Sequence, residues 1–325
     1  MKKKILYVYE KRIPIDLRKL IISSIKKQGY SCDSMNYQTP KSLQKKFFLK
    51  ADAVLFAPGR YLDSEILKNA KKAKIFQIWS SGYDKFNIKG AIEAQIPTCN
   101  NGSQNGIAVA EHAVLLMLAC LRKLIHFYDR TVKGNWKNNS HGVDLYELKN
   151  KTVGILGFGK IGKRVATILN GFGVNILYND INKLKPNEER KLNAKYCTKN
   201  YLFKNSDIIT LHLHLNKKTK NIINSKSFNV MKKNPILVNV SRAHLINRSS
   251  LISALKKKKI SGFGIDAHYL EPTERNDSLL QIENVISTPH IAGSTYDTYV
   301  RVIDSCLKNI KTAFKKPKNI KWKIN

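Results

Sequence analysis

The sequence predicts an α/β fold made of two doubly wound parallel-sheet domains. Two observations carry this prediction. Apolar, strand-like runs alternate with helix-like segments over the 325 residues, and a glycine-rich turn near mid-chain joins one such run to a helical pattern. Alternating strands and helices are typical of parallel sheets covered on both faces. With 42% hydrophobic residues, a chain of this length can build one large or two medium cores.

The N-terminal hundred residues predict the first sheet. Strands are expected at Ile5–Tyr9, Ser31–Asn36, Ala53–Ala57, Lys74–Trp79 and Ile96–Cys99, and helices at Leu17–Lys27 and Ile88–Gln95. No G-x-G-x-x-G motif occurs here, so this sheet is not expected to bind a dinucleotide. The loop Trp79–Asp84 contains Gly82, which permits an unusual backbone whose N–H groups could hold a carboxylate. On local sequence, a plain loop is the favoured interpretation.

The next segment, Gly106–Asp129, is apolar over most of its length. It predicts one long buried helix, which at about 30 Å for 20 residues could bridge two domains. The polar stretch Gly134–Asn150 is expected to be an irregular crossing loop.

The glycine-rich turn follows the apolar run that ends at Leu156. Gly157, Gly159 and Gly162 have the G-x-G-x-x-G spacing, which suits a tight turn, a close approach of the backbone to a pyrophosphate, and close packing of helix on strand. Asp180 ends the next predicted strand, near the spacing of about 20 residues expected for a ribose-binding carboxylate. An acid there repels a 2′-phosphate, so NAD is favoured over NADP, although the nearby Lys183 and Lys185 weaken that preference.

The rest of the chain predicts a Rossmann sheet and a final helix. Six strands are expected in alternation with helices, at Val153–Leu156, Val174–Tyr178, Asp207–Leu213, Ile236–Val240, Gly262–Ile265 and Val285–Ser287. Thr295–Phe314 predicts a helix that packs back on one of the domains.

Three side chains with complementary chemistry follow the last predicted strands: Arg242, Glu271 and His290. Ligands of open α/β sheets bind at the carboxyl ends of the strands. An arginine can hold a carboxylate with two hydrogen bonds, a histidine can exchange the hydroxyl proton, and a glutamate beside it favours the imidazolium. Each residue alone is ambiguous, because a single histidine or Glu-Pro step is more often structural.

Motifs in family order and at similar spacing resemble those of the NAD-dependent D-isomer-specific 2-hydroxyacid dehydrogenases. They are the glycine-rich turn and the stretches Asn105–His112, Ser206–His212, Asn239–Arg242, Gly264–Asp266 with Glu271-Pro272, and Thr288–Thr295. The resemblance implies a Rossmann NAD-binding domain, residues 102–292, inserted into a flavodoxin-like substrate domain formed by residues 1–101 and 293–325, with the cofactor cleft between them. It also implies hydride transfer between nicotinamide and C2 of a small 2-hydroxy or 2-oxo acid of the phosphoglycerate, hydroxypyruvate, glyoxylate or lactate type.

The same resemblance implies residue roles and a partner. Arg242, Glu271 and His290 would be catalytic, and Ser80, Ser81, Gly82 and Arg242 would bind the substrate carboxylate. Cofactor contacts would come from Gly157, Gly159, Lys160, Ile161, Gly162, Asp180, Val240, Ser241 and Asp266, the last at the nicotinamide carboxamide. A homodimer is expected, with the long helix near Val109 in its interface, and no metal.

Four positions depart from the family pattern. Ala243 and Ser80 replace glycines, Tyr296 stands where an acid is frequent, and His214 stands where proline is usual. None removes a catalytic group, so they bear on substrate identity. His214 is interpreted as structural.

Two alternatives stay open. One is an NAD(H)-sensing binding protein, like the corepressors called C-terminal binding proteins, which a basic charge would suit. The other is a formate dehydrogenase. Those enzymes are similar around Asn105–His112 but carry glutamine as the partner of the catalytic histidine, so Glu271 argues against this alternative.

The composition of the chain limits which binding partners and which cellular location are expected. The chain has 58 basic and 23 acidic residues, a net charge of +35. The lysines are scattered and no recognisable nucleic-acid module is present, so a solvated basic surface is favoured over nucleic-acid binding. No run approaches the ~18 apolar residues of a membrane span, and a short N-terminal apolar run predicts a strand and not a signal peptide. A soluble cytoplasmic protein is expected. Its five cysteines predict neither a disulfide framework nor a zinc site.

Overall fold

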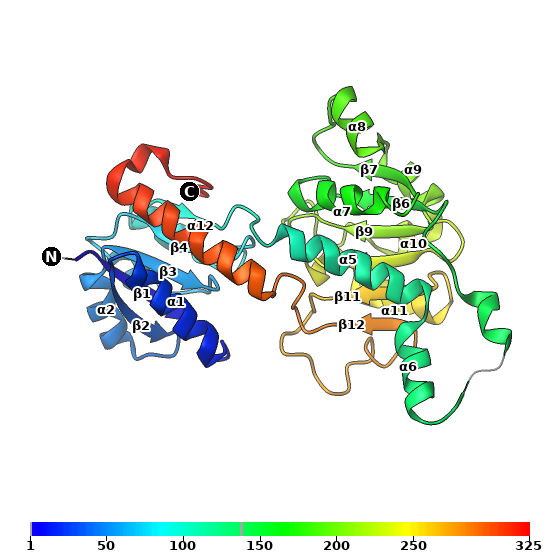
Figure 1. Ribbon diagram of the computed structural model, residues 1–325, viewed down its shortest axis with the longest axis horizontal. Coiled ribbons are helices and arrows are strands. Elements are labelled where there is room, and N and C mark those ends of the chain that lie inside the picture. The colour runs from blue at the N-terminus through cyan, green and yellow to red at the C-terminus, as the bar shows by residue number, and fades with distance from the viewer. Residues whose placement is uncertain (1, 137–138) are drawn as a thin grey trace. The chain divides into compact units, whose positions relative to one another are not determined.

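The computed structural model describes residues 2–136 and 139–325. Contacts divide the chain into two compact units (Figure 1). Unit 1 comprises Met1–Asn105 and Tyr296–Asn325, and unit 2 comprises Gly106–Thr295. Each unit contains one parallel sheet with helices packed on it, which confirms the predicted α/β class.

The sheet of unit 1 has five strands in the order β2-β1-β3-β4-β5. Every neighbouring pair is parallel, and this is the flavodoxin-like order. The strands are β1 (Lys4–Tyr9), β2 (Ser31–Asn36), β3 (Ala53–Ala57), β4 (Phe76–Ile78) and β5 (Thr98–Cys99). The fourth and fifth are shorter than predicted.

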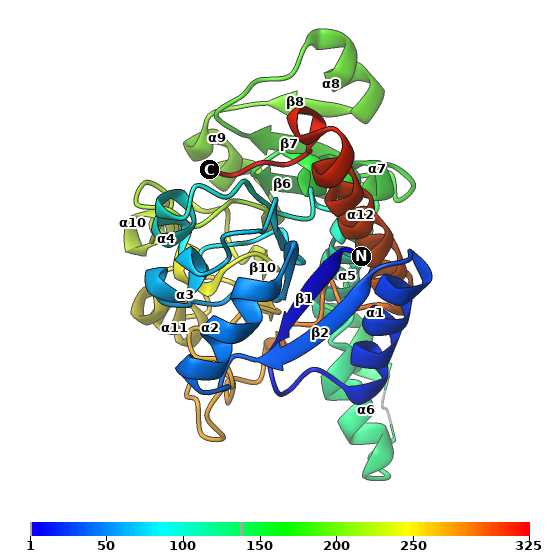
Figure 2. The same ribbon diagram turned by 90° about the vertical axis from the view of Figure 1, so that its left-hand side faces the viewer.

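Helices cover both faces of this sheet (Figure 2). Successive side chains of a strand point to opposite faces, so Ile5 and Tyr7 of β1 join one core cluster while Leu6 and Val8 join another. The first cluster includes residues of α1 (Ile15–Lys27) and α12 (Tyr296–Lys315). The second includes residues of α2 (Lys41–Lys50), α3 (Ser64–Lys68) and α4 (Ile88–Glu93). The final helix therefore packs within unit 1.

The sheet of unit 2 has seven parallel strands in the order β12-β11-β10-β9-β6-β7-β8, which contains the Rossmann order around β6. The strands are β6 (Thr152–Leu156), β7 (Asn175–Asn179), β8 (Ala194–Tyr196), β9 (Ile208–Leu211), β10 (Ile236–Asn239), β11 (Gly262–Ile265) and β12 (Val285–Ser287). The six predicted strands are present. The prediction missed β8, a three-residue strand with a lysine at its centre, because so short a segment shows no apolar run.

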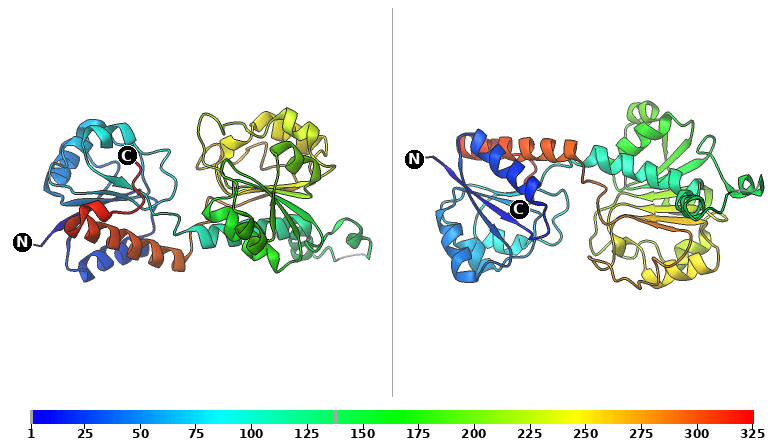
Figure 3. Two further views of the ribbon diagram at one scale, coloured as in Figure 1. Left: turned by 90° about the horizontal axis from the view of Figure 1, so that it is seen from above. Right: turned by 60° about the horizontal axis from the view of Figure 1, so that its bottom comes forward.

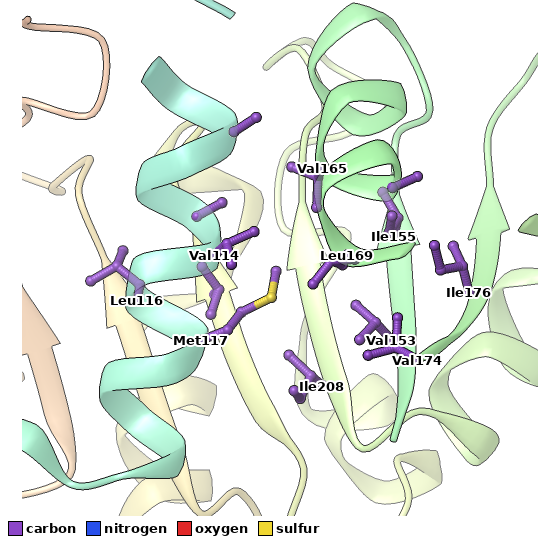
Figure 4. Close-up of a cluster of buried hydrophobic side chains, with 14 of the residues drawn as sticks. Val114, Leu116, Met117, Val153, Ile155, Val165, Leu169, Val174, Ile176 and Ile208 are labelled. Atoms are coloured by element: carbon purple, nitrogen blue, oxygen red, sulfur yellow. The ribbon is translucent and has the colours of Figure 1, made fainter. Parts of the chain in front are cut away.

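Helices lie on both faces of this sheet as well (Figure 3). One face packs against α5 (Gly106–Leu121) and α7 (Lys160–Asn170), with Val114 and Met117 of α5 and Leu169 of α7 in one apolar cluster (Figure 4). The other face packs against α9 (Lys199–Asn205), α10 (Ser225–Val230) and α11 (Arg248–Lys256). The short helix α8 (Pro186–Leu192) follows β7.

The single helix predicted over Gly106–Asp129 is wrong. The apolar run ends with α5 at Leu121, Lys123 adopts a left-handed backbone with φ of 47°, and a separate helix α6 (Leu124–Val132) follows. A left-handed residue cannot continue a right-handed helix. Helix α5 belongs to unit 2, where it packs on α7, β10 and β11.

Short 3₁₀ turns complete the fold: η1 (Asn139–Asp144), η2 (Ala243–Leu245) and η3 (Pro317–Asn319). Residues 137–138 of the predicted loop Gly134–Asn150 lie outside the described residues. None of the described helices combines the length and apolar composition that crossing a bilayer requires. All five cysteines are free, and residues 2–136 and 139–325 contain no His, Cys, Asp and Glu grouping suited to a metal.

Candidate active site

The last three strands of unit 2 bring the predicted catalytic residues to one edge of the sheet. Strands β10, β11 and β12 are neighbours and parallel, so the loops that follow them leave from the same side. Arg242 follows β10, Glu271 follows β11 and His290 follows β12.

His290 and Glu271 form a direct pair. His290 Nδ1 lies 2.6 Å from Glu271 Oε1. An ionised carboxylate only accepts hydrogen bonds, so the ring donates from Nδ1 and its Nε2 atom is left to face a ligand. The His290 side chain is 43% exposed whereas that of Glu271 is 13% exposed. The histidine is therefore accessible and its partner is shielded. The backbone N–H of His268 also donates to Glu271 Oε1, at 3.2 Å.

Asp266 ties down the backbone around His290. Its carboxylate is fully buried. Oδ1 accepts from Thr288 Oγ1 at 2.6 Å and from the Ile291 N–H at 2.8 Å, and Oδ2 accepts from the Ala292 N–H at 2.9 Å. His290 lies between these anchors in a left-handed conformation with φ of 57°. That region is uncommon for a residue with a side chain, so these hydrogen bonds offset its cost.

Two further histidines surround this segment, and neither was singled out from the sequence. His112 Nε2 on α5 lies 2.9 Å from Thr288 Oγ1, and His268 Nε2 lies 2.8 Å from the Thr288 carbonyl oxygen. The signal for them was weak: His112 ends the motif Asn105–His112, and His268 follows Asp266 by two positions.

Arg242 begins the turn after β10. Its Nη1 donates to the Ser241 carbonyl oxygen at 2.8 Å, and its own carbonyl oxygen accepts from Asn239 Nδ2 at 2.9 Å. Ser241 Oγ donates to the Leu211 carbonyl oxygen at 2.8 Å, which joins this turn to the end of β9. Val240 and Ala243 are buried beside it.

The glycine-rich turn has the shape that a dinucleotide needs. Gly157 has φ of 94°, and a Cβ on Gly162 would lie 2.3 Å from the Gly157 carbonyl oxygen, so neither position tolerates a side chain. A Cβ on Gly159 would meet no atom of the described residues within 4 Å. The second glycine thus borders open space at the start of α7, where Lys160 and Ile161 follow, and this is where a pyrophosphate approaches in such folds.

Asp180 lies beside that turn, after β7. Its Oδ2 accepts from the Phe158 N–H at 2.6 Å and its Oδ1 from the Asn182 N–H at 3.0 Å. A carboxylate in this place can accept from the hydroxyls of an adenosine ribose. The observed turn and acid therefore fit NAD.

His212 contributes a buried polar atom next to the same turn. A Cβ on Gly157 would touch the His212 backbone at 2.7 Å. The ring Nε2 lies 2.9 Å from Thr210 Oγ1, while Nδ1 has no partner among the described residues. Burial lowers the pKa of His212 to about 3, so the ring is neutral near pH 7. His214, two positions on, is exposed.

The predicted carboxylate-binding loop belongs to unit 1, after β4. Ser80 Oγ donates to the Gly82 carbonyl oxygen at 2.7 Å, and Ser81 Oγ lies 2.6 Å from the Oδ1 atoms of both Asn101 and Asn105. Within residues 2–136 and 139–325, the backbone N–H groups of Ser81 and Gly82 have no acceptor. Such N–H groups can receive an anion.

Comparison with known proteins supplies the family. Residues 114–292 match the sequence profile described as "D-isomer specific 2-hydroxyacid dehydrogenase, NAD binding domain". A glyoxylate reductase of Thermococcus litoralis is 34% identical over 276 residues, which is 83% of each chain. Among solved structures, D-lactate dehydrogenase of Lactobacillus jensenii with NAD+ superposes with a TM-score of 0.83 at 27% identity and covers 99% of both chains.

The fold is shared more widely. A D-2-hydroxyisocaproate dehydrogenase superposes with a TM-score of 0.85 at 23% identity over 97% of both chains. On the sequence match and the identity with the glyoxylate reductase, the chain belongs to the D-isomer-specific 2-hydroxyacid dehydrogenase family, oxidoreductases that interconvert 2-hydroxy and 2-oxo acids.

Proposed function

We propose that this enzyme reduces glyoxylate, or another 2-oxo acid of similar size, with NADH. The observation that carries the proposal is the His290–Glu271 pair at the edge of the Rossmann sheet, the same edge at which Arg242 follows β10. The glyoxylate reductase of Thermococcus litoralis, at 34% identity, supports the choice of a small substrate.

In this proposal each catalytic side chain has one task. The bound nicotinamide supplies the hydride to C2 of the oxo acid. His290 donates a proton from Nε2 to the substrate oxygen, and Glu271 holds the opposite ring nitrogen and so fixes the orientation of the ring. Arg242 holds the carboxylate and polarises the adjacent carbonyl.

The Ser80–Gly82 loop is proposed as the second carboxylate contact. The backbone N–H groups of Ser81 and Gly82 supply the donors. Ser80 stands where the family more often has glycine, and its hydroxyl spans the loop to the Gly82 carbonyl oxygen. This contact restrains the loop that would present the two N–H groups.

NAD is the proposed cofactor, in preference to NADP. Asp180 lies against the glycine-rich turn through its hydrogen bond from the Phe158 N–H, where a negative charge repels a 2′-phosphate. Lys183, which could counter that repulsion, has its Nζ 5.6 Å from the centre of the Tyr196 ring. Asp180 is therefore proposed to set the preference, against the opposing charges of Lys183 and Lys185. Lys160, Ile161, Val240, Ser241 and Asp266 are proposed as further cofactor contacts.

Replacing His290 by alanine tests the catalytic assignment. The H290A enzyme should lose about 10²- to 10⁴-fold in kcat, the range of a general acid, and should bind NADH within about twofold of wild type, because the glycine-rich turn is unchanged. NADH oxidation followed optically with glyoxylate, pyruvate, hydroxypyruvate and phosphohydroxypyruvate gives kcat, and NADH fluorescence gives its Kd.

The control is H214N, which alters an exposed histidine and should retain wild-type turnover. Full turnover by H290A would contradict the role of His290. Wild-type protein that binds NADH yet reduces none of these acids would contradict the proposed substrate class.

A homodimer is proposed from an apolar face on unit 2. Helix α6 buries none of its residues, although Leu124, Ile125, Tyr128 and Val132 lie along one of its sides and are 49–67% exposed. Leu115 on α5 is 51% exposed. Apolar patches of this kind on a soluble protein mark interfaces, and a second copy of the chain is the proposed partner.

The double variant L124E/Y128E should shift the sedimentation coefficient from that of a dimer to that of a monomer, because two buried charges oppose association. The control I181E changes a side chain that is 98% exposed and should leave the coefficient unchanged. Wild-type protein that sediments as a monomer at micromolar concentration would contradict the proposal.

A cytoplasmic location is proposed from cysteine chemistry. All five cysteines are unpaired, as is usual in a reducing compartment. Burial raises the pKa of the Cys32 and Cys99 thiols to about 11, so neither is positioned as a redox-reactive thiolate.

A further inference from the structure

The last described residues of unit 1, Ile320–Asn325, form a return segment that runs back along β5. Lys323 bridges antiparallel to Cys99. The Asn100 N–H donates to the Trp322 carbonyl oxygen at 3.1 Å, and the Ile324 N–H donates to the Thr98 carbonyl oxygen at 2.9 Å. The return segment thus pairs with the edge of the sheet, at the point where β5 leads into the turn 100–103.

Trp322 is the residue that packs on this turn. A Cβ on Gly102 would lie 2.2 Å from Cε2 of the indole, so the ring rests directly on the Gly102 backbone. Both residues have left-handed backbones, with φ of 63° for Gly102 and 59° for Trp322. Glycine adopts that conformation freely whereas tryptophan does not. Tertiary contacts therefore hold Trp322 in place.

The same turn holds the Ser80–Gly82 loop. Asn100 Nδ2 donates to the Ser81 carbonyl oxygen at 3.0 Å, while Asn100 Oδ1 accepts from the Gly102 N–H at 2.9 Å. Asn101, which is 1% exposed, lies 2.6 Å from Ser81 Oγ through its Oδ1, and that atom also accepts from the Ser103 N–H at 2.9 Å. Asn100 and Asn101 thus connect the turn on which Trp322 packs to Ser81.

A buried amide network fixes the start of the return segment to the same place. Gln77 Nε2 donates to the Asn100 carbonyl oxygen at 2.9 Å, and Gln77 Oε1 accepts from Asn309 Nδ2 at 2.8 Å. Asn309 Oδ1 accepts from the Lys321 N–H at 2.8 Å. Gln77 is fully buried and Asn309 is 3% exposed. A buried amide group without a hydrogen-bond partner destabilises the folded protein. These pairings therefore favour one arrangement of Gln77, Asn309 and the backbone groups that they bind.

We infer that the return segment positions the substrate-binding loop, with Trp322 as its main positioning residue. Trp322 holds the turn 100–103, the turn holds Ser81 by side-chain and backbone contacts, and Ser81 presents its N–H group to the substrate carboxylate. This inference rests on the carboxylate-binding role proposed for Ser80–Gly82. It predicts that the return segment controls the affinity for the oxo acid. The affinity for NADH, whose proposed site lies in unit 2, should not depend on this segment.

The test compares W322A, W322F and N100A with wild type in the full chain. W322A and N100A should raise KM for glyoxylate at least tenfold, change kcat less than threefold, and leave the Kd for NADH within twofold. W322F keeps an aromatic ring over Gly102 and should restore most of the affinity. The control Y61A removes an aromatic ring that is 66% exposed on the same unit and should change none of these values.

Hydrogen exchange gives a second readout that does not depend on turnover. Amides of residues 100–103, each of which donates a hydrogen bond within unit 1, should exchange faster in W322A than in wild type, while those of β6 and α7 should not change. If W322A does not fold, N100A and W322F still carry the test.

Failure of the inference and failure of the function are distinguishable. Wild-type KM and wild-type exchange in W322A and N100A, with a raised KM in G82P, which removes one of the proposed N–H donors, would overturn the positioning role and leave the carboxylate loop intact. Equal losses of glyoxylate and NADH affinity would also overturn it, because they indicate a general effect on folding. A wild-type enzyme that reduces no 2-oxo acid would instead overturn the proposed function.

Discussion

At the scale of single residues, the candidate active site separates an exposed acid–base group from a shielded partner. His290 can reach a ligand, Glu271 is covered, and Asp266 uses its buried carboxylate to hold Thr288, Ile291 and Ala292. The contact of Asp266 with the nicotinamide carboxamide stays a prediction. Its observed hydrogen bonds show that any change at Asp266 also alters the backbone of His290.

His212 provides a prediction about pH. Its pKa is lowered to about 3 in the folded protein by burial, against about 6.5 in an unfolded chain. Between these values the unfolded chain binds the extra proton, so the contribution of His212 to stability is complete above about pH 6.5 and is lost as the pH falls.

Urea unfolding between pH 4 and 7 measures this effect. Replacing His212 by asparagine should reduce the slope of the unfolding free energy against pH, by up to about 1.4 kcal/mol per pH unit. The control H214N changes an exposed ring and should keep the wild-type slope. Equal slopes in wild type and H212N would show that His212 does not titrate on unfolding.

At the scale of elements, the turn between β6 and α7 contains two glycines with different expected roles, one in packing and one in cofactor binding. Gly162 has no room for a side chain because the Gly157 carbonyl oxygen lies next to it, whereas Gly159 faces open space. Gly162 is required by the packing of the turn, and Gly159 is proposed to be required by the cofactor.

Two alanine variants test that separation. G162A should destabilise the cofactor-free protein by about 1–3 kcal/mol, the usual cost of overpacking. G159A should unfold within about 0.5 kcal/mol of wild type, as surface changes do, but should bind NADH at least about tenfold more weakly, since its methyl group occupies the approach of the pyrophosphate. Urea unfolding and NADH fluorescence measure the two quantities. Wild-type NADH affinity in G159A would count against the proposed cofactor site.

The segment predicted as one long helix forms two helices, α5 and α6, because its surroundings change along its length. The apolar composition of α5 suits a helix that packs on the sheet beside α7, and the helix ends before Lys123, where that burial ends. The apolar side of α6 then faces outward, which supports the proposed dimer.

At the scale of the whole molecule, the chain forms unit 1, then all of unit 2, and returns to unit 1 through α12 and the return segment. Its net charge of +35 is distributed over this fold with few compensating acids. Like charges repel one another and destabilise a compact state, and this repulsion is screened over about 10 Å at 0.1 M salt.

The thermal midpoint should therefore rise when sodium chloride is increased from about 0.02 M to about 0.3 M, because screening weakens the repulsion. Differential scanning fluorimetry without cofactor measures it, and sucrose at equal osmolality is the control for a general solute effect. A midpoint that falls with salt would mean that surface ion pairs, such as Lys232 with Asp207, outweigh the repulsion.

Much of the fold could be predicted because its signals are local. The apolar runs of β1, β3 and β6, the spacing of Gly157, Gly159 and Gly162, and the position of Asp180 after a strand all depend on residues close together in the chain. Arg242, Glu271 and His290 were identified because each follows a strand within a recognisable motif, and the structure pairs two of them directly. The prediction failed where the local signal was weak, at β8 and at the break between α5 and α6.

The sequence by itself determined the two sheets, the nucleotide-binding turn and the residues proposed for chemistry. Only the tertiary structure decided which polar atoms meet. Thr288 lies between His112 and Asp266, His212 Nδ1 is buried without a partner among the described residues, and Trp322 rests on Gly102. These contacts join segments far apart in the chain. Their formation depends on strand register and side-chain packing, which short-range patterns of polarity do not encode.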